Sequence, residues 1–427
     1  MNDNKVTYRD ILRDSEYRKL IFSNVINRFG DSVDALALIW LVYQITQSAA
    51  WSALFFGLNW IPNVVVQPFA GAIVEKMNKK RVIVLTHLMR ALAISAFALM
   101  YALGMVNAAV MVVTTLFITT VESFNLPADS AFTASTIRKK DLTTGMSLNT
   151  MLTSGATLVG TGIAGAIIAL WGVVPAMIID ISTFFIAAFL IAIMKDKKDK
   201  TTEEPQPDPS EKESFFTLFK DGIKYVTKTP VVRNFCFLCI AMNFMLVPFN
   251  ALQAPIAGEI FGMGSELLSF AGVFSSIGGI AGSALLPIAS RRISPLKVTC
   301  IGIAAISACI AVVSFGGIFS GNPIACYIVI SACFFIMTIA ASLMGGTISV
   351  QFMKTTDRSY MARASAVFSA SATAAMPAGS FLVSALLSRI STSNILLVSA
   401  VFSAVVLLIT AVTKPELERK EGIPDAA

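Results

Sequence analysis

The sequence predicts an all-α membrane protein with twelve transmembrane helices arranged as two bundles of six. The composition is one reason: the 427 residues are 55% hydrophobic and 14% charged, with a mean hydropathy of +0.73, whereas soluble domains are about a quarter charged. The second reason is that twelve stretches have the roughly 20 apolar residues that a helix needs to cross a bilayer. The third is a long polar stretch that separates the sixth of these from the seventh.

The twelve candidate spans follow one another with short connections, apart from that polar stretch. Each is predominantly apolar, and some are long enough to project beyond the bilayer. They lie near residues 18–46, 50–74, 81–104, 107–128, 143–170, 173–194, 231–257, 265–290, 297–317, 321–352, 359–388 and 392–413.

Basic residues are distributed unevenly about these spans. If residue 1 is placed in the cytoplasm, thirty of the 33 Lys and Arg fall on the cytoplasmic side, while Arg389 falls on the other side and Arg28 and Arg90 lie inside spans. This bias predicts a multi-pass protein of the cell membrane (plasma or inner membrane) with both termini cytoplasmic. It also explains the net charge of +7 without a nucleic-acid partner. Residues 1–20 are too polar for a cleavable signal peptide, so we expect the first span to direct insertion.

A polar linker divides the chain. Residues 195–214, KDKKDKTTEEPQPDPSEKES, are charged and nearly free of apolar residues, as flexible segments are. The stretch that follows, FFTLFKDGIKYVTK, has an apolar face opposite three lysines and predicts an amphipathic helix on the inner leaflet. We therefore expect an N-terminal bundle over 1–194, a cytoplasmic linker over 195–230, a C-terminal bundle over 231–413 and a cytoplasmic tail over 414–427.

The two halves repeat weakly at an offset of 216 residues. This spacing separates Asn27 from Asn243, and also Asp34 from Asn250. Parallel repeats of six spans occur in two-domain secondary transporters. The second pair indicates an asymmetry, because only the first half keeps an acid at this position.

The loop after the second span, GAIVEKMNKKRV, matches the Gly-x-x-x-Asp-Arg-x-x-Arg-Arg/Lys motif of the major facilitator superfamily. Gly71 takes the glycine position, Glu75 that of the acid, Lys76 that of the first base, and Lys79 and Lys80 those of the later bases. The chain also resembles the macrolide-efflux-type branch in NRFGDSVDALALIWLVYQIT, IIDISTFFIAAFLIAI, GVFSSIGGIAGSALL and RASAVFSASATAAMPAGSFLVSAL. This resemblance implies the major facilitator fold and a drug:proton antiporter. The chain departs from that branch in two places: the glycine run SGATLVGTGIAG lacks the usual proline, and Glu122 lies in the fourth span, where such antiporters carry a buried arginine.

The first span carries one polar face. Asn24, Asn27, Arg28, Asp31 and Asp34 recur at helical spacing in an otherwise apolar stretch. A charge inside a membrane costs about 2.5–3.5 kcal/mol and usually faces a cavity or a partner, so we expect this face to line a cavity between the halves. Arg28 and Asp31 are expected to pair with each other. Asp34 lacks a local partner, and a poorly hydrated site favours a protonated carboxyl. Asp34 is therefore the predicted proton carrier, with a satisfied packing acid as the alternative.

Other charged residues lie in later spans of the first half. Glu122 is predicted to be a second cavity acid or a gate residue, and Asp180 either a cavity acid or a helix-packing residue. Arg90 is the expected partner of an acid in the first or fourth span. His87, the single histidine, is expected at the membrane interface rather than in a proton relay.

Spans of the second half carry almost no charge. Asn243, Asn250 and Gln253 lie in the proline-containing segment NFMLVPFNALQAP, and prolines there free backbone carbonyls to line a cavity. Together with Asn27, these are the expected substrate contacts. The acidic first half would handle protons, and a second half rich in Phe and Met would contact an apolar ligand.

The loop motif also predicts a gate. Glu75 is expected to meet the positive N-terminal end of the eleventh span, near Arg358 and Arg363, and so to hold the cytoplasmic face closed together with Gly71, Lys76, Lys79 and Lys80. The alternative is a positive-inside anchor alone, which explains the lysines but not Glu75.

We therefore expect a secondary active transporter that exports hydrophobic small molecules of the drug or macrolide type by proton antiport and alternating access. The cavity acids favour cationic substrates. The alternative is an exporter of the same fold with a dedicated cargo, such as a siderophore or a lipid-like metabolite. A membrane enzyme is disfavoured because one histidine and scattered acids form no catalytic cluster.

No cofactor and no metal site are expected, because the six cysteines all lie in apolar spans of the second half and resemble packing residues. The expected partners are a small-molecule substrate, protons and the lipid bilayer, with no nucleic acid. We expect the chain to act as a monomer.

Overall fold

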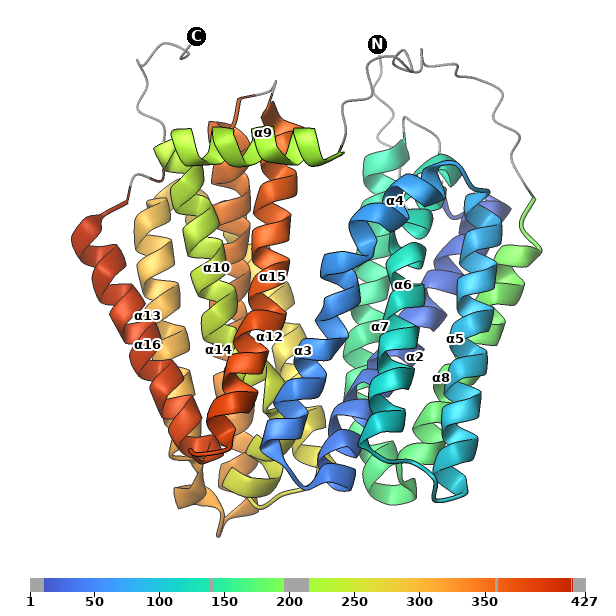
Figure 1. Cartoon of the computed structure of the whole chain (residues 1–427), viewed down its shortest axis with the longest axis horizontal. Coiled ribbons are helices and arrows are strands. Elements are labelled where there is room, and N and C mark those ends of the chain that lie inside the picture. Colours follow the sequence, from blue (N-terminus) through green and yellow to red (C-terminus); the bar gives the residue numbers. More distant parts are fainter. Residues whose placement is uncertain (1–10, 138–140, 196–214, 358–359, 416, 418–427) are drawn as a thin grey trace.

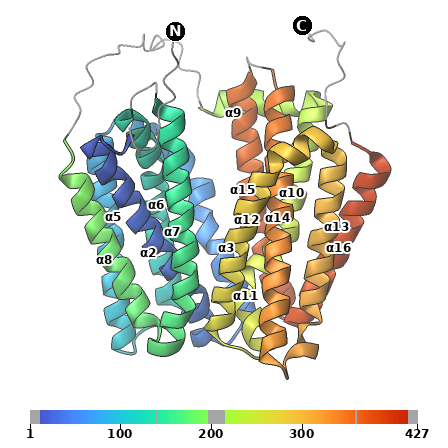
Figure 2. The same ribbon diagram turned by 180° about the vertical axis from the view of Figure 1, so that it is seen from behind.

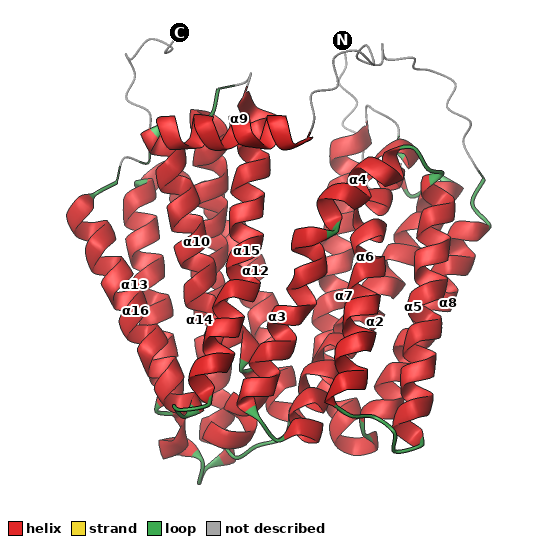
Figure 3. Ribbon diagram, in the orientation of Figure 1, coloured by secondary structure: helices red, strands yellow, loops and turns green. Residues whose placement is uncertain are grey.

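The computed structural model describes residues 11–137, 141–195, 215–357, 360–415 and 417. Throughout these residues the regular elements are helices, and no strand occurs among them (Figure 3). The expectations for Arg358, for most of the linker and for most of the tail lie outside the described residues. The division of the chain at the linker therefore stays a prediction.

The described residues of the first half form seven helices, most of which stand roughly parallel, whereas α4 is inclined to them (Figure 1). They are α2 (Ser15–Thr46), α3 (Ala49–Val65), α4 (Gln67–Glu75), α5 (Lys79–Ala102), α6 (Ala108–Thr136), α7 (Leu142–Trp171) and α8 (Val173–Ala192).

The second half begins with α9 (Phe215–Lys228), which lies across the ends of the helices that follow it (Figure 1). Those helices are α10 (Pro230–Ala251), α11 (Gln253–Pro255), the π-helix η3 (Ile256–Ile260), α12 (Ser265–Arg292), α13 (Pro295–Ser314), the 3-10 helix η4 (Gly316–Phe319), α14 (Pro323–Thr355), α15 (Met361–Leu387) and α16 (Thr392–Thr413).

The predicted all-α membrane fold is confirmed, and among the described residues eleven of the twelve expected spans have the length and hydropathy of a membrane helix. Of the described helices, ten are long and apolar enough to cross a membrane, and α3 with α4 adds an eleventh as a bent pair. The twelfth is α2, which at 32 residues is longer than most of the others but is made less apolar by its polar face. The start of α2 and the end of α16 lie on the same face of the molecule as α9 (Figure 1). We call this the α9 face.

Local sequence explains where many helices begin. The Asp14 carboxylate caps α2 by accepting hydrogen bonds from the backbone N–H groups of Glu16 and Tyr17. Asn78 and Asn107 cap α5 and α6 in the same way. Such caps satisfy N–H groups that the first turn of a helix leaves without partners.

Prolines explain two departures from the expected spans. The second span, expected as one helix, breaks between α3 and α4, with Pro62 inside α3 and Pro68 at the start of α4. The seventh breaks after α10 and ends in a π-helix, with Pro248 and Pro255 on either side of the break. A proline removes a backbone donor and obstructs the preceding turn, so helices kink or end near it.

In the first half, α2 packs against α7 and α8. Its close approach to α8 depends on Gly30, where an added Cβ would collide with Thr183 and Asp180. The Ser23 hydroxyl donates to the Ala187 carbonyl in the same interface, at 3.2 Å. Small residues of this kind let membrane helices pack closely.

The amphipathic helix α9 packs on α15 and α10. The Tyr225 hydroxyl donates to the Asp357 carboxylate at 3.1 Å, and the Tyr225 ring stacks on that of Tyr360 with centroids 4.6 Å apart. Gly222 lies directly against the Arg363 backbone, because an added Cβ would come within 2.6 Å of its carbonyl oxygen. The helix is therefore fixed to the end of α15.

The two halves meet at the face opposite α9. Near this face the Ser384 hydroxyl of α15 donates to the Ala50 carbonyl of α3 at 2.8 Å, and the Ser380 hydroxyl donates to the Ala53 carbonyl. Helices α7 and α12 also touch there, and they diverge toward the α9 face (Figure 2). A space of about 780 Å³ separates their diverging parts. The structure is closed on the opposite face and open on the α9 face.

Candidate functional site

A cavity of about 250 Å³ lies inside the first half, bordered mainly by α2, α5 and α6, and not between the halves as expected. Five charged side chains line it: Arg28, Asp31, Asp34, Arg90 and Glu122. The rest of the wall is largely apolar, with Leu38, Ile94, Phe97, Met111, Ile118 and Met177. The structure thus brings together most of the charged residues that the sequence singled out.

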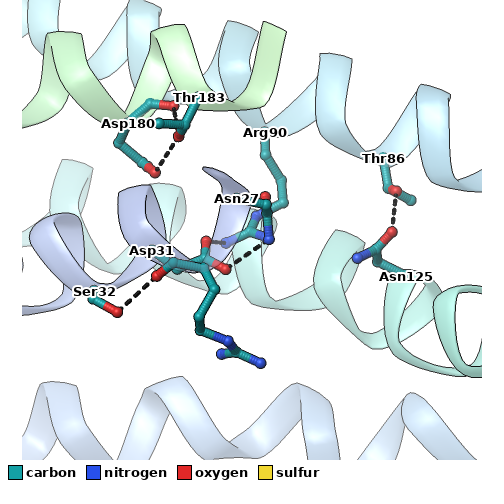
Figure 4. Close-up of polar contacts among 9 residues, drawn as sticks. Asn27, Asp31, Ser32, Thr86, Arg90, Asn125, Asp180 and Thr183 are labelled. Atoms are coloured by element: carbon teal, nitrogen blue, oxygen red, sulfur yellow. Dashed lines mark hydrogen bonds and ion pairs between the residues drawn. The ribbon is translucent and has the colours of Figure 1, made fainter. Parts of the chain in front are cut away.

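An ion pair forms the rear wall of this cavity. The Arg90 Nη2 lies 2.9 Å from the Asp31 Oδ1, and the Asn27 amide donates to the Asp31 Oδ2 at 2.9 Å (Figure 4). The Arg90 guanidinium also stacks over the Phe184 ring of α8, 4.3 Å from its centroid. Arg90 is only 6% exposed, so its charge depends on the Asp31 partner.

The expected pair between Arg28 and Asp31 is wrong for this structure. Both oxygens of the Asp31 carboxylate are occupied, one by Arg90 and the other by Asn27. Arg28 remains exposed to the cavity. The physical reason is that α5 places a buried cation against Asp31, and a buried charge gains more from a partner than a hydrated one does.

Two further acids face the cavity from opposite walls. Asp34 of α2 and Glu122 of α6 are both half-buried lining residues. Among the described residues, neither side chain makes a hydrogen bond or an ion pair, in contrast to Asp31. Asp34 and Glu122 are therefore the carboxyl groups available to a ligand or a proton.

Behind the ion pair lies a smaller and more polar chamber, of about 100 Å³. It shares Arg28, Asp31, Arg90 and Glu122 with the main cavity, and adds His87, Asp129 and four amides, Asn24, Asn27, Asn125 and Asn149. Two hydrogen bonds hold its walls together. Asn24 donates to Asn149 at 3.1 Å. The Thr86 hydroxyl donates to Asn125 at 2.9 Å, as Figure 4 shows.

Asp180 and His87 are buried next to this network. Asp180 is 1% exposed on α8 and accepts a 3.4 Å hydrogen bond from Thr183 (Figure 4). It does not line the cavity. His87 is 4% exposed, and its ring lies 5.7 Å from that of Phe184. His87 therefore faces inward toward α8, and its expected position at the membrane interface stays a prediction.

The structure does not bring the expected substrate contacts of the second half to the cavity. Asn243 donates to the Cys239 carbonyl within its own helix, at 2.9 Å. Asn250 and Gln253 are half-buried near the break after α10 and do not line the cavity. Asn27 lies close to the cavity, but its amide is committed to Asp31.

The gate residues lie at the α9 face, where the halves are apart. Glu75 is exposed, and an added Cβ at Gly71 would meet nothing within 4 Å. Arg363 of α15 lies 3.7 Å from Asp221 of α9. Among the described residues no ion pair joins Glu75 to Arg363, so the expected contact is not made in this conformation.

Two lysines of the loop donate hydrogen bonds to carbonyls at the C-terminal ends of helices. Lys79 donates to the Glu75 carbonyl at the end of α4, and Lys80 donates to the Met194 carbonyl just after α8. Cations at such C-termini satisfy free carbonyls and the helix dipole. Lys76 is exposed.

Sequence reasoning missed Asp129. The fourth span was expected to end at residue 128, whereas α6 continues to Thr136 and carries Asp129 into the chamber. A signal was present, because Glu122, Asn125 and Asp129 recur at helical spacing.

Several known proteins are similar to this chain in sequence. A model of the Major Facilitator Superfamily matches residues 20–370. The multidrug efflux pump Tap of Mycolicibacterium fortuitum is 24% identical over 289 residues, which span 64% of this chain and 67% of the pump. The uncharacterized MFS-type transporter YvqJ of Bacillus subtilis (strain 168) is 23% identical over 252 residues, and the match spans only 57% of either chain.

Solved structures match nearly the whole chain at low identity. The nucleoside transporter NupG has a TM-score of 0.74 at 13% identity, with 94% of this chain and 100% of that chain covered. A bacterial homologue of the iron transporter ferroportin, in its inward-facing state, has a TM-score of 0.70 at 14% identity, with 93% and 98% covered. At such identities these likenesses show the fold.

Proposed function

Because this chain belongs to the Major Facilitator Superfamily, we propose that it exports hydrophobic small molecules, cations foremost, by proton antiport, as members of the macrolide-efflux-type branch do. The family and the fold are those of transporters of small molecules. The similarity to a multidrug efflux pump supports a drug-like substrate. In this proposal the α9 face is cytoplasmic, and a single chain carries out transport.

The observation that carries the proposal is the composition of the cavity. Asp31 is neutralised by Arg90, which leaves Asp34 and Glu122 opposite a single cation, Arg28. The cavity is therefore net negative when its acids are ionised. The surrounding walls include Phe97, Met111 and Met177. Aromatic and thioether groups beside a carboxylate suit a lipophilic cation.

The same carboxyl groups supply a coupling mechanism. An ionised Asp34 attracts a cationic substrate, and a protonated Asp34 does not. Substrate and proton would then compete for the cavity, so that each leaves as the other binds. Carrying either one across also removes net charge from the cavity, which makes the occluded intermediate less costly in the membrane.

Alternating access would require two sets of contacts between the halves to form and break. In the conformation described, α3–α15 and α7–α12 close the face opposite α9. The opposite state requires these contacts to break and the α9 face to close, which is the rocking motion expected of two repeats that move against each other.

The proposal is tested with purified protein in liposomes whose lumen is more acidic than the medium. We expect ethidium, a lipophilic cation, to accumulate inside as protons leave, and a protonophore to abolish the accumulation. An anionic dye of similar size should not accumulate. Ethidium accumulation that does not depend on the proton gradient would exclude antiport. A preference for the anionic dye would exclude a cation site.

A further inference from the structure

We propose that the polar chamber behind the cavity holds water and passes protons between Glu122 and the α9 face, with Asp129 as the exchanging acid. The chamber is lined by residues of α2, α5, α6 and α7. This inference rests on the proposed proton antiport and adds a route for the proton that is separate from the route of the substrate.

The first observation is the nature of the chamber walls. Four amides, a histidine and several charged groups surround about 100 Å³, and Leu126 is the one apolar residue of that lining, whereas seven apolar residues line the main cavity. Liquid water occupies about 30 Å³ per molecule, so the space admits roughly three waters. A polar chamber of this size inside a membrane protein is stable only when its groups are hydrated.

The second observation is a set of buried polar atoms without protein partners. The His87 Nδ1 and the Arg90 Nε belong to side chains that line the chamber and are at least nine-tenths buried, and neither has a hydrogen bond within the described structure. The Asn27 Oδ1 is unpartnered as well. Buried polar atoms are rarely left without hydrogen bonds. Water in the chamber would supply them.

The third observation is the spacing of acids along α6. Glu122 lines both the cavity and the chamber, whereas Asp129 lines only the chamber. Seven residues separate the two, which places Asp129 about 10 Å closer to the α9 face on the same side of the helix. Asn125 lies between them and also lines the chamber.

The surrounding charges allow Asp129 to titrate. Arg28 and Asp31 face the chamber from α2, His87 and Arg90 from α5, and Glu122 from α6. From α7 only the uncharged Asn149 and Thr153 face it. Arg90 is neutralised by Asp31, which leaves Arg28 as the single cation of the lining opposite two acids, Glu122 and Asp129.

The transfer step conserves charge and atoms. Glu122 gives its proton to a chamber water, one O–H bond breaking at the acid and one forming at the water, and that water gives a proton to the Asp129 carboxylate. Asp129 then releases the proton to water at the α9 face. No electron transfer is involved, and the substrate can stay in the cavity throughout.

The test uses the reconstituted full-length protein with ethidium, in two measurements. One follows accumulation driven by a proton gradient, and the other follows exchange of ethidium at equal pH on both sides. Asp129→Asn should slow the driven accumulation about tenfold or more and leave the exchange unchanged. Asp129→Glu should restore the driven rate. Ser130→Asn places the same new side chain on the next, exposed residue of α6 and should behave as the wild type.

The outcomes separate this inference from the proposed function. If the wild type shows no dependence on the gradient, antiport itself is wrong. If the wild type depends on the gradient and Asp129→Asn keeps the full dependence, the route through Asp129 is wrong. If Asp129→Asn also loses ethidium exchange, the variant Thr153→Leu is tested instead. This change fills the chamber from α7 without altering an acid. Thr153→Leu should then selectively slow the driven rate, and a normal driven rate would overturn the inference.

Discussion

Arg90 of α5 binds Asp31 of α2 through a contact of 2.9 Å between Nη2 and Oδ1, although 59 residues separate the two in the chain. The pair fixes the two helices to each other next to the cavity. It also determines which charged groups remain available, because Asp34, Glu122 and Arg28 are not part of it.

We expect the loss of either partner to destabilise the protein. Arg90→Met leaves Asp31 without its cation, and Asp31→Asn leaves a nearly buried guanidinium without its anion. Breaking a buried pair in this way costs about 3–5 kcal/mol. The melting temperature of the purified protein should fall in each single variant and recover in part in the double variant, since the double variant leaves no isolated charge. A double variant less stable than both single variants would contradict a direct pair.

We expect Asp34→Asn to fold and insert normally but to transport without dependence on the proton gradient. Asp34 is half-buried in the cavity and can therefore change protonation without breaking the Arg90–Asp31 pair. Exchange of ethidium at equal pH should survive with weaker binding, because Glu122 still supplies an acid to the cavity when the Asp34 charge is removed. Driven accumulation of ethidium in liposomes is the measurement, and Glu122→Gln is the comparison. Normal gradient dependence in Asp34→Asn, with its loss in Glu122→Gln, would assign coupling to Glu122.

We expect Glu75→Ala to lower the turnover rate more than the substrate affinity. Glu75 is exposed at the open α9 face in this conformation, so its contacts would form only when that face closes. A residue of this kind acts on the conformational equilibrium rather than on the binding site. Transport rate and ethidium binding should be measured side by side, with Met77→Ala as a control, because Met77 is exposed in the same loop and lies outside the predicted gate. Weaker binding at an unchanged rate would contradict a gate.

We expect Gly165→Ala to disfavour closure of the face opposite α9. The Ser269 hydroxyl of α12 accepts a hydrogen bond from the Gly165 N–H at 2.6 Å and donates to the Thr161 carbonyl at 2.8 Å. A Cβ at Gly165 would collide with Ser269, and such overpacking costs about 1–3 kcal/mol.

The distance between spin labels at Trp171 and Ile318, both exposed near that face, should lengthen in Gly165→Ala. Gly155→Ala is the matched control, because a Cβ there would meet nothing within 4 Å. Equal distances in the two variants would show that the α7–α12 contact does not determine closure.

We expect a cysteine at Lys224 to be labelled only from the cytoplasm and one at Glu259 only from outside. Both positions are exposed, and they lie on opposite faces, in α9 and in η3. The orientation rests on the distribution of basic residues. Labelling of position 224 by a membrane-impermeant reagent in intact cells would reverse the topology.

Hydrophobic length and turn signals were sufficient to predict most of the fold. The last span was expected at 392–413 and α16 occupies Thr392–Thr413, because Ser391 provides an N-cap and an uninterrupted apolar run follows it. The fourth span was predicted two turns too short. Turns in soluble proteins are favoured by residues such as Asn125, Pro127 and Asp129. A membrane helix can continue through them where its polar side chains face a polar chamber.

The site was predictable in composition but not in pairing. Helical spacing alone placed Asn27, Asp31 and Asp34 on one face of α2. It favoured Arg28 as the partner of Asp31, because Arg28 is three residues away. The choice of Arg90 depends on how α5 and α8 pack around α2, with Phe184 covering the guanidinium and Gly30 allowing the close approach. Contacts between helices of this kind leave no periodic signal in a single sequence.

The seams that close the face opposite α9 have a consequence for the effect of ionic strength. Hydroxyl groups, carbonyls and glycines make these contacts, as at Ser384 with Ala50 and at Ser269 with Gly165. Dissolved ions affect such uncharged contacts very little, whereas they weaken the attraction between exposed charges, with a screening length of about 10 Å at 0.1 M salt. Closure of the α9 face through Glu75 would involve charges of that exposed kind. If the α9 face is cytoplasmic and closes through Glu75, added salt should weaken only one of the two closed states, and a saltier cytoplasm should hold more of the molecules in the conformation described here.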